Sequence, residues 1–391
     1  MEKKLSYYSL EPHLRNVRYG GYFQIDPNSP SMSKWLHKVY MRIILFLTLG
    51  FTSQQILKVY EVRDDLDTVM ATMFLLLTHF DSIYKEVVMM VKADQVQELL
   101  EIMKGQLFNQ PEDEHKKLLL QTARKAKMLL YLFNCTALIT CFLWVLYPLV
   151  LFLQGKHVEF AIWLPFDVNE SPQFFIALLY VWIQTSWLAF NNTTMDVLIA
   201  FFLGQCTTQL NILRYDLENF VQMCKNKSKV SGESYKIVLH TKFKKILFHH
   251  NEIITFYEKV EDIYGGAIFC QFLFSGWILC TTAYRLVGIE MLSIEFLSMV
   301  LYLSCMLVEL FLFCFYGSEV THASEKLMES AYFMNWLETP IQHRKNLILF
   351  MERLKKPILP KAAIIVPLSN TTFISIVRSS YTFYAFLKNT Q

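Results

Sequence analysis

The last residues of the chain, TTFISIVRSSYTFYAFLKNTQ (371–391), combine the apolar pattern of a membrane helix with groups suited to contact with water or ions. Arg378 lies among Ser and Thr hydroxyls, and Tyr381 and Tyr384 follow it. Ionisable side chains within a membrane span usually face protein or a water-filled cavity. What this helix does therefore depends on which side of the membrane its end faces.

A second group of residues is suited to ligand binding, because isolated polar groups occur there among aromatic and aliphatic ones. A pocket whose walls have this composition fits a small, mostly hydrophobic ligand. Aromatic residues at helical spacing also form ordinary packing contacts, so that alternative stays open. The candidates are Met73, Leu77, Phe80, Thr140, Trp144, Tyr147, Tyr180, Gln184, Phe272 and Phe296.

Motifs for catalysis or metal binding do not occur. The sequence contains no GxGxxG, GxxxxGK[ST], HExxH or GxSxG, and the eight cysteines lack metal-type spacing. The adjacent His249 and His250 diverge on a helix, and we expect them to be solvated or to pair with Glu252. We therefore predict no enzyme activity, cofactor or metal, and a net charge of +3 gives no indication of nucleic-acid binding.

The composition is that of an integral membrane protein. Hydrophobic residues make up 53% of the 391 residues and charged residues 18%. A span needs about 20 mainly apolar residues to cross a hydrocarbon core about 30 Å thick. Seven stretches qualify, at about 38–57, 67–91, 128–153, 174–202, 263–284, 292–316 and 362–387. We predict no cleaved signal peptide, because no apolar segment with a cleavage site follows the first basic residues.

The second predicted span is the least regular, because Asp81, Lys85 and Glu86 lie in its later part. Two interpretations stand side by side. The charged residues face a wet cavity or a neighbouring helix, or else the span reaches the membrane interface early.

The distribution of basic residues predicts the orientation. Of the 37 Lys and Arg, 29 lie in the N-terminal segment and in the second, fourth and sixth loops, and five lie in the remaining loops and the C-terminal end. Short loops rich in Lys and Arg stay in the cytoplasm. We therefore predict a cytoplasmic N-terminus and an extracellular C-terminus, the reverse of a G-protein-coupled receptor. Asn169, in the third loop, is then the candidate glycosylation site with clear outside access.

Several helices are predicted to extend beyond the membrane on the cytoplasmic side. Apolar residues recur at three and four positions from Phe243 to Val260, directly before the fifth span, and a similar pattern continues the sixth span to Trp336. No proline interrupts residues 174–220. We predict an all-α, seven-transmembrane protein with an intracellular helical anchor layer. It forms one domain over 1–391, with a cytoplasmic segment (1–37), spans one to six (38–361) and a seventh span with the extracellular end (362–391).

The C-terminal order KPILPKAAIIVPLSNTTFISIVRSSYTFYAFL resembles the closing signature of insect odorant receptors. The matching residues are Pro357, Pro367-Leu368-Ser369, Thr372-Phe373, Arg378 and Tyr381-Thr382-Phe383. The segment SEKLMESAYFMNW (324–336) and the third-loop LPFD (164–167) are also similar to family elements. The fourth loop has no long insertion, which favours a ligand-tuned subunit over the shared coreceptor.

This resemblance implies an odorant-gated, non-selective cation channel of four subunits, a heterotetramer with the coreceptor in the plasma membrane of olfactory sensory neurons. A small volatile organic ligand would bind in the outer half of the bundle. The seventh helices would line the pore, which explains their hydroxyls and short tail. The implied pore and gate residues are Arg378, Tyr381, Tyr384, Leu387 and Lys388. A gustatory-type channel of the same superfamily is the alternative, and a G-protein-coupled receptor, a transporter or an embedded enzyme is less favoured.

Overall fold

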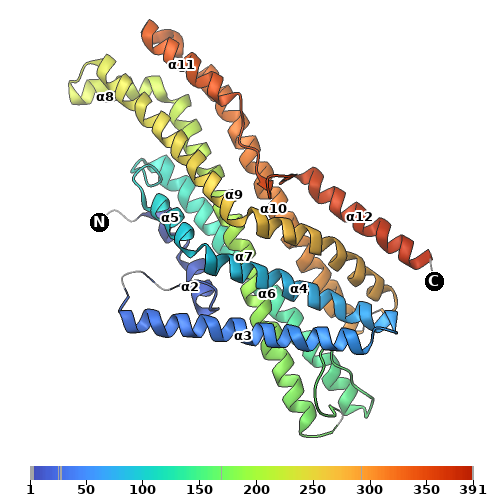
Figure 1. The fold of residues 1–391 in the computed structure, drawn as a ribbon. Helices are drawn as coiled ribbons and strands as arrows, with labels where there is room; N and C mark the ends of the chain where they lie inside the picture. The colour runs from blue at the N-terminus through green and yellow to red at the C-terminus, as the bar shows by residue number, and fades with distance from the viewer. Residues whose placement is uncertain (1–3, 25, 27–28, 169, 292, 390–391) are drawn as a thin grey trace.

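The computed structural model describes residues 4–24, 26, 29–168, 170–291 and 293–389, and its elements are almost all helices (Figure 1). The N-terminal part contains α1 (Leu5–Tyr8), α2 (Glu11–Tyr19), α3 (Ser31–Glu61), α4 (Leu66–Val91) and α5 (Ala93–Lys104). The central part contains α6 (Asp113–Leu153), α7 (Gln173–Glu218), α8 (Phe220–Ser231) and α9 (Tyr235–Val287). The C-terminal part contains α10 (Ile294–Phe333), the 3-10 helix η1 (Trp336–Glu338), α11 (Ile341–Leu354), β1 (Lys361–Ala362), β2 (Val366–Pro367) and α12 (Asn370–Asn389).

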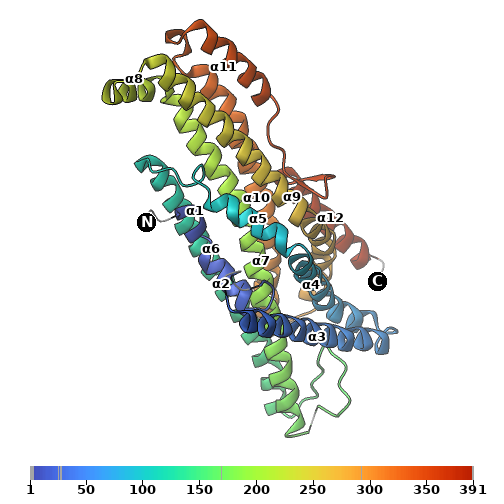
Figure 2. The same cartoon turned by 60° about the vertical axis from the view of Figure 1, so that its left-hand side comes forward.

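The long helices pack side by side into one elongated bundle (Figures 1 and 2). α7 contacts α6, α9 and α10, and α9 also contacts α4 and α12. α8 and α11 lie at one end of the bundle, and the connection between α6 and α7 lies at the other. One buried apolar cluster extends from Leu10 to Leu368. α7 is therefore the central helix against which the others are positioned.

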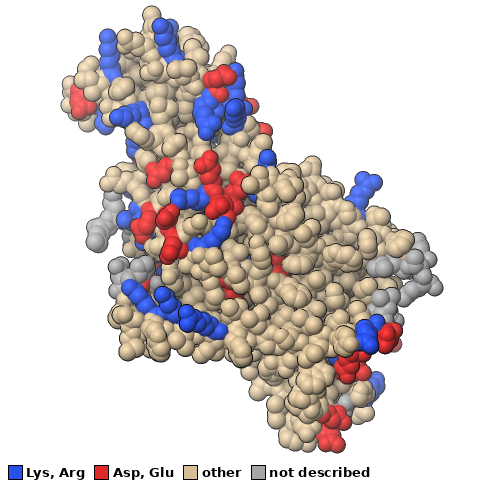
Figure 3. Space-filling model, viewed as in Figure 1, with Lys and Arg blue, Asp and Glu red and all other residues tan. Residues whose placement is uncertain are grey.

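Within the described residues, five helices are long and apolar enough to cross a membrane: α3, α6, α7, α9 and α10. α4 and α12, the second and seventh predicted spans, do not belong to this group, so seven spans stay a prediction. On the face shown in Figure 3, Lys and Arg gather towards the end formed by α8 and α11, and much of the surface beyond is uncharged. An uncharged surface of this kind is suited to lipid contact.

The predicted helical extensions are confirmed. α7 continues without interruption to Glu218, α9 begins at Tyr235 and α10 reaches Phe333. These segments are helical because their apolar residues recur on one face and no proline interrupts the backbone hydrogen bonds. That this end of the bundle is intracellular stays a prediction.

The predicted start of the last span at Ala362 is wrong. Lys361 and Ala362 pair with Val366 and Pro367 in a short antiparallel hairpin, and α12 begins eight residues later, at Asn370. The Ser369 hydroxyl accepts a hydrogen bond from the backbone N–H of Thr372 at 3.2 Å, as an N-cap does. The predicted start of the sixth span, Leu292, lies outside the described residues, as does Asn169.

The expectation of solvated histidines at positions 249 and 250 is also wrong. His249 is buried, and one ring nitrogen lies 2.9 Å from the Gln209 side-chain oxygen. His250 is buried with its ring 5.4 Å from that of Phe350 on α11. Nearby, His343 stacks on a phenylalanine, and burial lowers its pKa to about 4. Neutral imidazoles thus pack like aromatic residues at this end of the bundle.

Candidate functional site

A cavity of about 50 Å³ lies between α4, α6, α7 and α10, and we call it the inner cavity. Its lining residues recur at three and four positions along each helix, so one face of each helix is directed towards it. Most are apolar, and the polar ones are mainly Thr, Asn and a single Glu. The lining comprises Leu75, Thr78, Phe133, Ala137, Thr140, Cys141, Trp144, Thr185, Leu188, Ala189, Asn192, Thr193, Tyr302, Cys305, Met306 and Glu309.

A second cavity of about 170 Å³, the outer cavity, adjoins the first. The two share Leu75, Trp144 and Thr185 in their linings. The outer cavity is bordered by residues 158–161 of the connection between α6 and α7, and by Arg285 and Glu295, whose side chains pair at 2.7 Å. The two cavities therefore lie next to each other, with the outer cavity beside that connection.

Three aromatic rings lie where the two cavities meet. The ring of Trp144 lies 5.3 Å from that of Tyr302 and 5.9 Å from that of Phe74, and the last two are 5.1 Å apart. Tyr302 is held by a 2.7 Å hydrogen bond between its hydroxyl and that of Thr78. The Trp144 Nε1 is buried and has no hydrogen-bond partner among the described residues. This donor is free to bind a ligand oxygen.

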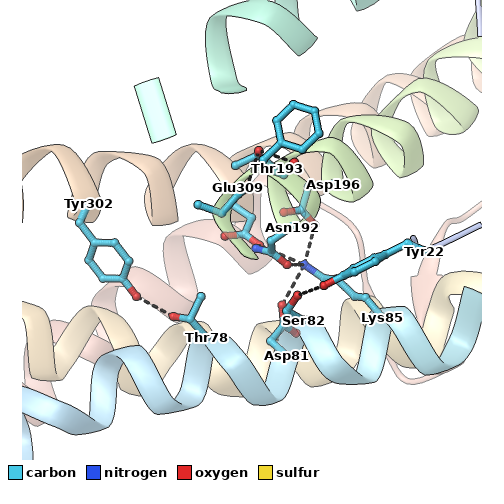
Figure 4. Close-up of polar contacts among 12 residues, drawn as sticks. Tyr22, Thr78, Asp81, Ser82, Lys85, Asn192, Thr193, Asp196, Tyr302 and Glu309 are labelled. Atoms are coloured by element: carbon cyan, nitrogen blue, oxygen red, sulfur yellow. Dashed lines mark hydrogen bonds and ion pairs between the residues drawn. The ribbon is translucent and has the colours of Figure 1, made fainter. Parts of the chain in front are cut away.

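Charged residues meet at the far end of the inner cavity (Figure 4). The ammonium of Lys85 on α4 lies 2.8 Å from Asp81 Oδ2, 2.6 Å from Asp196 Oδ1 on α7 and 3.1 Å from Glu309 Oε1 on α10. The Asn192 side chain accepts from Lys85 and donates to Glu309, both at 3.0 Å. We call Asp81, Lys85, Asn192, Asp196 and Glu309 the charged cluster.

All members of the charged cluster are buried. Asp81 and Lys85 therefore face neighbouring helices, as the first of the two interpretations of the second span expects, and the position of the membrane interface stays a prediction. Burying charge in a nonpolar environment is costly unless the charges are paired. The charged cluster therefore fixes α4, α7 and α10 relative to one another.

The chain matches the family model described as 7tm Odorant receptor over residues 65–381. It belongs to the odorant receptor family of insects. Odorant receptor Or1 of Anopheles gambiae is 24% identical in an alignment 388 positions long, which covers 93% of this chain and 91% of that protein. This membership favours the odorant branch over the gustatory and G-protein-coupled alternatives.

The chain is also similar to a second relative and to a solved structure. Odorant receptor 94a of Drosophila melanogaster is 29% identical over 242 residues, 61% of this chain, and the match spans 60% of that relative's length. The structure of the insect olfactory receptor OR5 from Machilis hrabei in complex with eugenol has a TM-score of 0.85 and 17% identity, and the match covers 98% of both chains. At this identity the likeness shows a common fold.

The receptor places only some of the predicted ligand residues at the cavities. Thr140 and Trp144 line the inner cavity, and Trp144 and Tyr147 line the outer one. Tyr180 instead donates a 2.8 Å hydrogen bond to the Gln54 side chain on α3. The other predicted residues, Met73, Leu77, Phe80, Gln184, Phe272 and Phe296, are not in either lining. A role in binding stays a prediction for all ten.

Sequence reasoning missed the cavity residues of α10. Tyr302, Met306 and Glu309 are spaced by four and three residues, so they share one face of the helix. The signal that could have found them is Glu309 itself, because an ionisable residue within an apolar run usually faces protein or water. Thr78 was missed because a threonine within a span commonly bonds its own backbone, and it does so here with the Phe74 carbonyl.

The predicted pore helix, α12, packs one face on α9 and α10 and leaves another exposed. Its ring contacts are Phe373 with Phe311 at 5.6 Å and Phe383 with Trp277 at 5.2 Å. Arg378 and Tyr381 are exposed, and Tyr384 is half-buried, 6.2 Å from Tyr381 between ring centres. The side chains of Leu387 and Lys388 lie outside the described residues. Pore lining by these five stays a prediction.

Proposed function

We propose that this receptor is the ligand-binding subunit of an odorant-gated, non-selective cation channel in the plasma membrane of olfactory sensory neurons. A small volatile organic molecule would occupy the inner and outer cavities. The observation that carries the proposal is the pair of adjacent cavities lined by apolar and aromatic side chains with few polar groups, in a fold shared with an olfactory receptor solved with eugenol.

The gating mechanism we propose uses the contacts of α10. This helix lines the inner cavity and packs against α12, where the Phe311 and Phe373 rings meet. A ligand shifts a conformational equilibrium only through its difference in affinity for the two states. A ligand that favours one packing of α4, α6, α7 and α10 would therefore bias the position of α12.

We propose that α12 lines the pore and that the receptor assembles with a coreceptor as a heterotetramer. The exposed side chains of Arg378 and Tyr381 support this, because a polar face on a membrane helix needs water or protein beside it. Tyr384, Leu387 and Lys388 would form the constriction near the outer end. Whole-cell recording with and without the coreceptor, across small aromatics, esters and alcohols, tests the proposal. A current that persists in excised patches without nucleotide excludes G-protein signalling.

Removing the indole of Trp144 should change the odorant response while assembly persists. The side chain contacts both cavities, so Trp144→Ala should raise the EC50 of an aromatic agonist about tenfold or change the ligand ranking. Dose–response currents with surface biotinylation measure this. Trp182→Ala is the matched control, because Trp182 lies on α7 with 38% exposure, outside both linings. Unchanged sensitivity and ranking in Trp144→Ala would show that the ligand binds elsewhere.

The predicted orientation has a direct test. An epitope added after Gln391 should bind antibody on intact cells, and one placed before Met1 should require permeabilisation, because the basic loops keep the other side in the cytoplasm. Immunofluorescence before and after permeabilisation measures both. A C-terminal epitope reached only after permeabilisation would contradict the orientation and the pore assigned to α12.

A further inference from the structure

The charged cluster contains more negative than positive groups. Three carboxylates, from Asp81, Asp196 and Glu309, contact one ammonium. Among the residues that the structure describes, Lys85 is the one Lys or Arg that is buried. Asp81 Oδ1 is also buried without a hydrogen-bond partner in the described part of the chain. Three carboxylates against one ammonium give the charged cluster a formal excess of negative charge, which a second cation would compensate.

Glu309 is the carboxylate that connects the charged cluster to the inner cavity. It belongs to the cavity lining together with Asn192, whereas Asp81 and Asp196 do not. A ligand that fills the inner cavity therefore ends beside an acidic side chain. Glu309 Oε1 already accepts from Lys85 and Asn192, so this carboxylate is held in place before any ligand arrives.

The inner cavity of about 50 Å³ suits the ammonium end of an amine, and the other end of the ligand would extend into the adjacent outer cavity of about 170 Å³. Aliphatic and aromatic side chains surround the polar end, with Phe133, Trp144 and Tyr302 supplying rings. Aromatic faces attract ammonium groups, and this attraction strengthens where water is excluded. On the approach through the outer cavity, the positive charge of Arg285 is matched by Glu295 at 2.7 Å.

We propose that the preferred ligands of this receptor are small organic amines that bind as ammonium ions, with the ammonium group on Glu309. The inference rests on the proposed function and names its ligand class. A neutral alcohol of the same shape can donate one hydrogen bond to Glu309 but brings no compensating charge. Hydrogen bonds between charged partners are about twice as strong as neutral ones.

Benzylamine, benzyl alcohol and toluene test the proposal, because they share a skeleton and differ in the head group. In cells expressing the receptor with its coreceptor, the EC50 for benzylamine should be at least about tenfold below that for benzyl alcohol, and toluene should be weakest. In Glu309→Gln the benzylamine preference should fall to about threefold or less, because the amide keeps the size of the side chain without its charge.

Glu319→Gln is the matched control, since it makes the same substitution at an exposed position of α10 and should keep the preference. A preference that persists in Glu309→Gln, or benzyl alcohol as potent as benzylamine in the unmutated receptor, would overturn the inference and leave the proposed function standing. Currents from no ligand of the panel would count against the proposed function itself. If Glu309→Gln does not reach the surface, the potency order of benzylamine, benzyl alcohol and toluene in the unmutated receptor tests the inference by itself.

Discussion

Lys85→Met should remove most of the folded receptor from the cell surface. The substitution keeps an unbranched apolar chain of similar length but leaves three buried carboxylates without their shared cation. Removing one partner of a buried ion pair typically costs about 3–5 kcal/mol, a large part of the stability of a typical domain. We expect surface biotinylation to fall to about a tenth or less, and the detergent-solubilised protein to unfold at a lower temperature.

Two further variants separate charge from side-chain size. Lys92→Met makes the same change just after α4, where the side chain is 31% exposed and pairs with Asp262 at 3.5 Å, so it should cost little. Adding Asp196→Asn to Lys85→Met should restore part of the surface level, because one uncompensated charge is removed. Normal surface expression of Lys85→Met would show that the carboxylates are protonated or otherwise neutralised without Lys85.

The sequence sufficed for the long helices and their extensions, because apolar periodicity and the absence of proline determine them locally. It did not suffice for the hairpin before α12. Ala363 and Ile364 have φ values of +47° and +67°, as the central residues of a type I′ turn do. Asn and Gly are the usual residues there, so Ala-Ile gives no turn signal. The apolar run from Ala362 therefore predicts a helix where the structure has a hairpin.

For the candidate site, too, the sequence predicts which residues share one face of a helix, but not which face of the neighbouring helix packs against them. Spacing along α6 placed Thr140 and Trp144 on one face, and both line the inner cavity. Which face of α10 meets them depends on how side chains of separate helices interdigitate, and a single helix does not encode that. The sequence likewise shows Lys85 within four residues of Asp81, but the contacts to Asp196 and Glu309 span more than 100 positions.

A methyl group at position 317 should strongly reduce the ligand-gated current. Gly317 lies on α10, two turns beyond the cavity residue Glu309, and a Cβ there would lie 2.5 Å from the carbonyl oxygen of Leu368. Just beyond this contact, the Ser318 hydroxyl accepts a 3.1 Å hydrogen bond from the backbone N–H of Asn370, the first residue of α12. Gly317→Ala must therefore displace the segment that connects the cavity helix to the proposed pore helix.

Backbone gives way less easily than a flexible side chain, and overpacking of this kind costs about 1–3 kcal/mol. We expect the maximal current per surface receptor to fall about tenfold, measured by whole-cell recording normalised to biotinylation. Gly50→Ala on α3 is the matched control, because no atom beyond its chain neighbours and the backbone of its own helix turn lies within 4 Å of the added Cβ. If Gly317→Ala conducts like Gly50→Ala, the contact with Leu368 is not rigid. Ligand binding would then have to reach α12 by another route, such as the packing of Phe311 on Phe373.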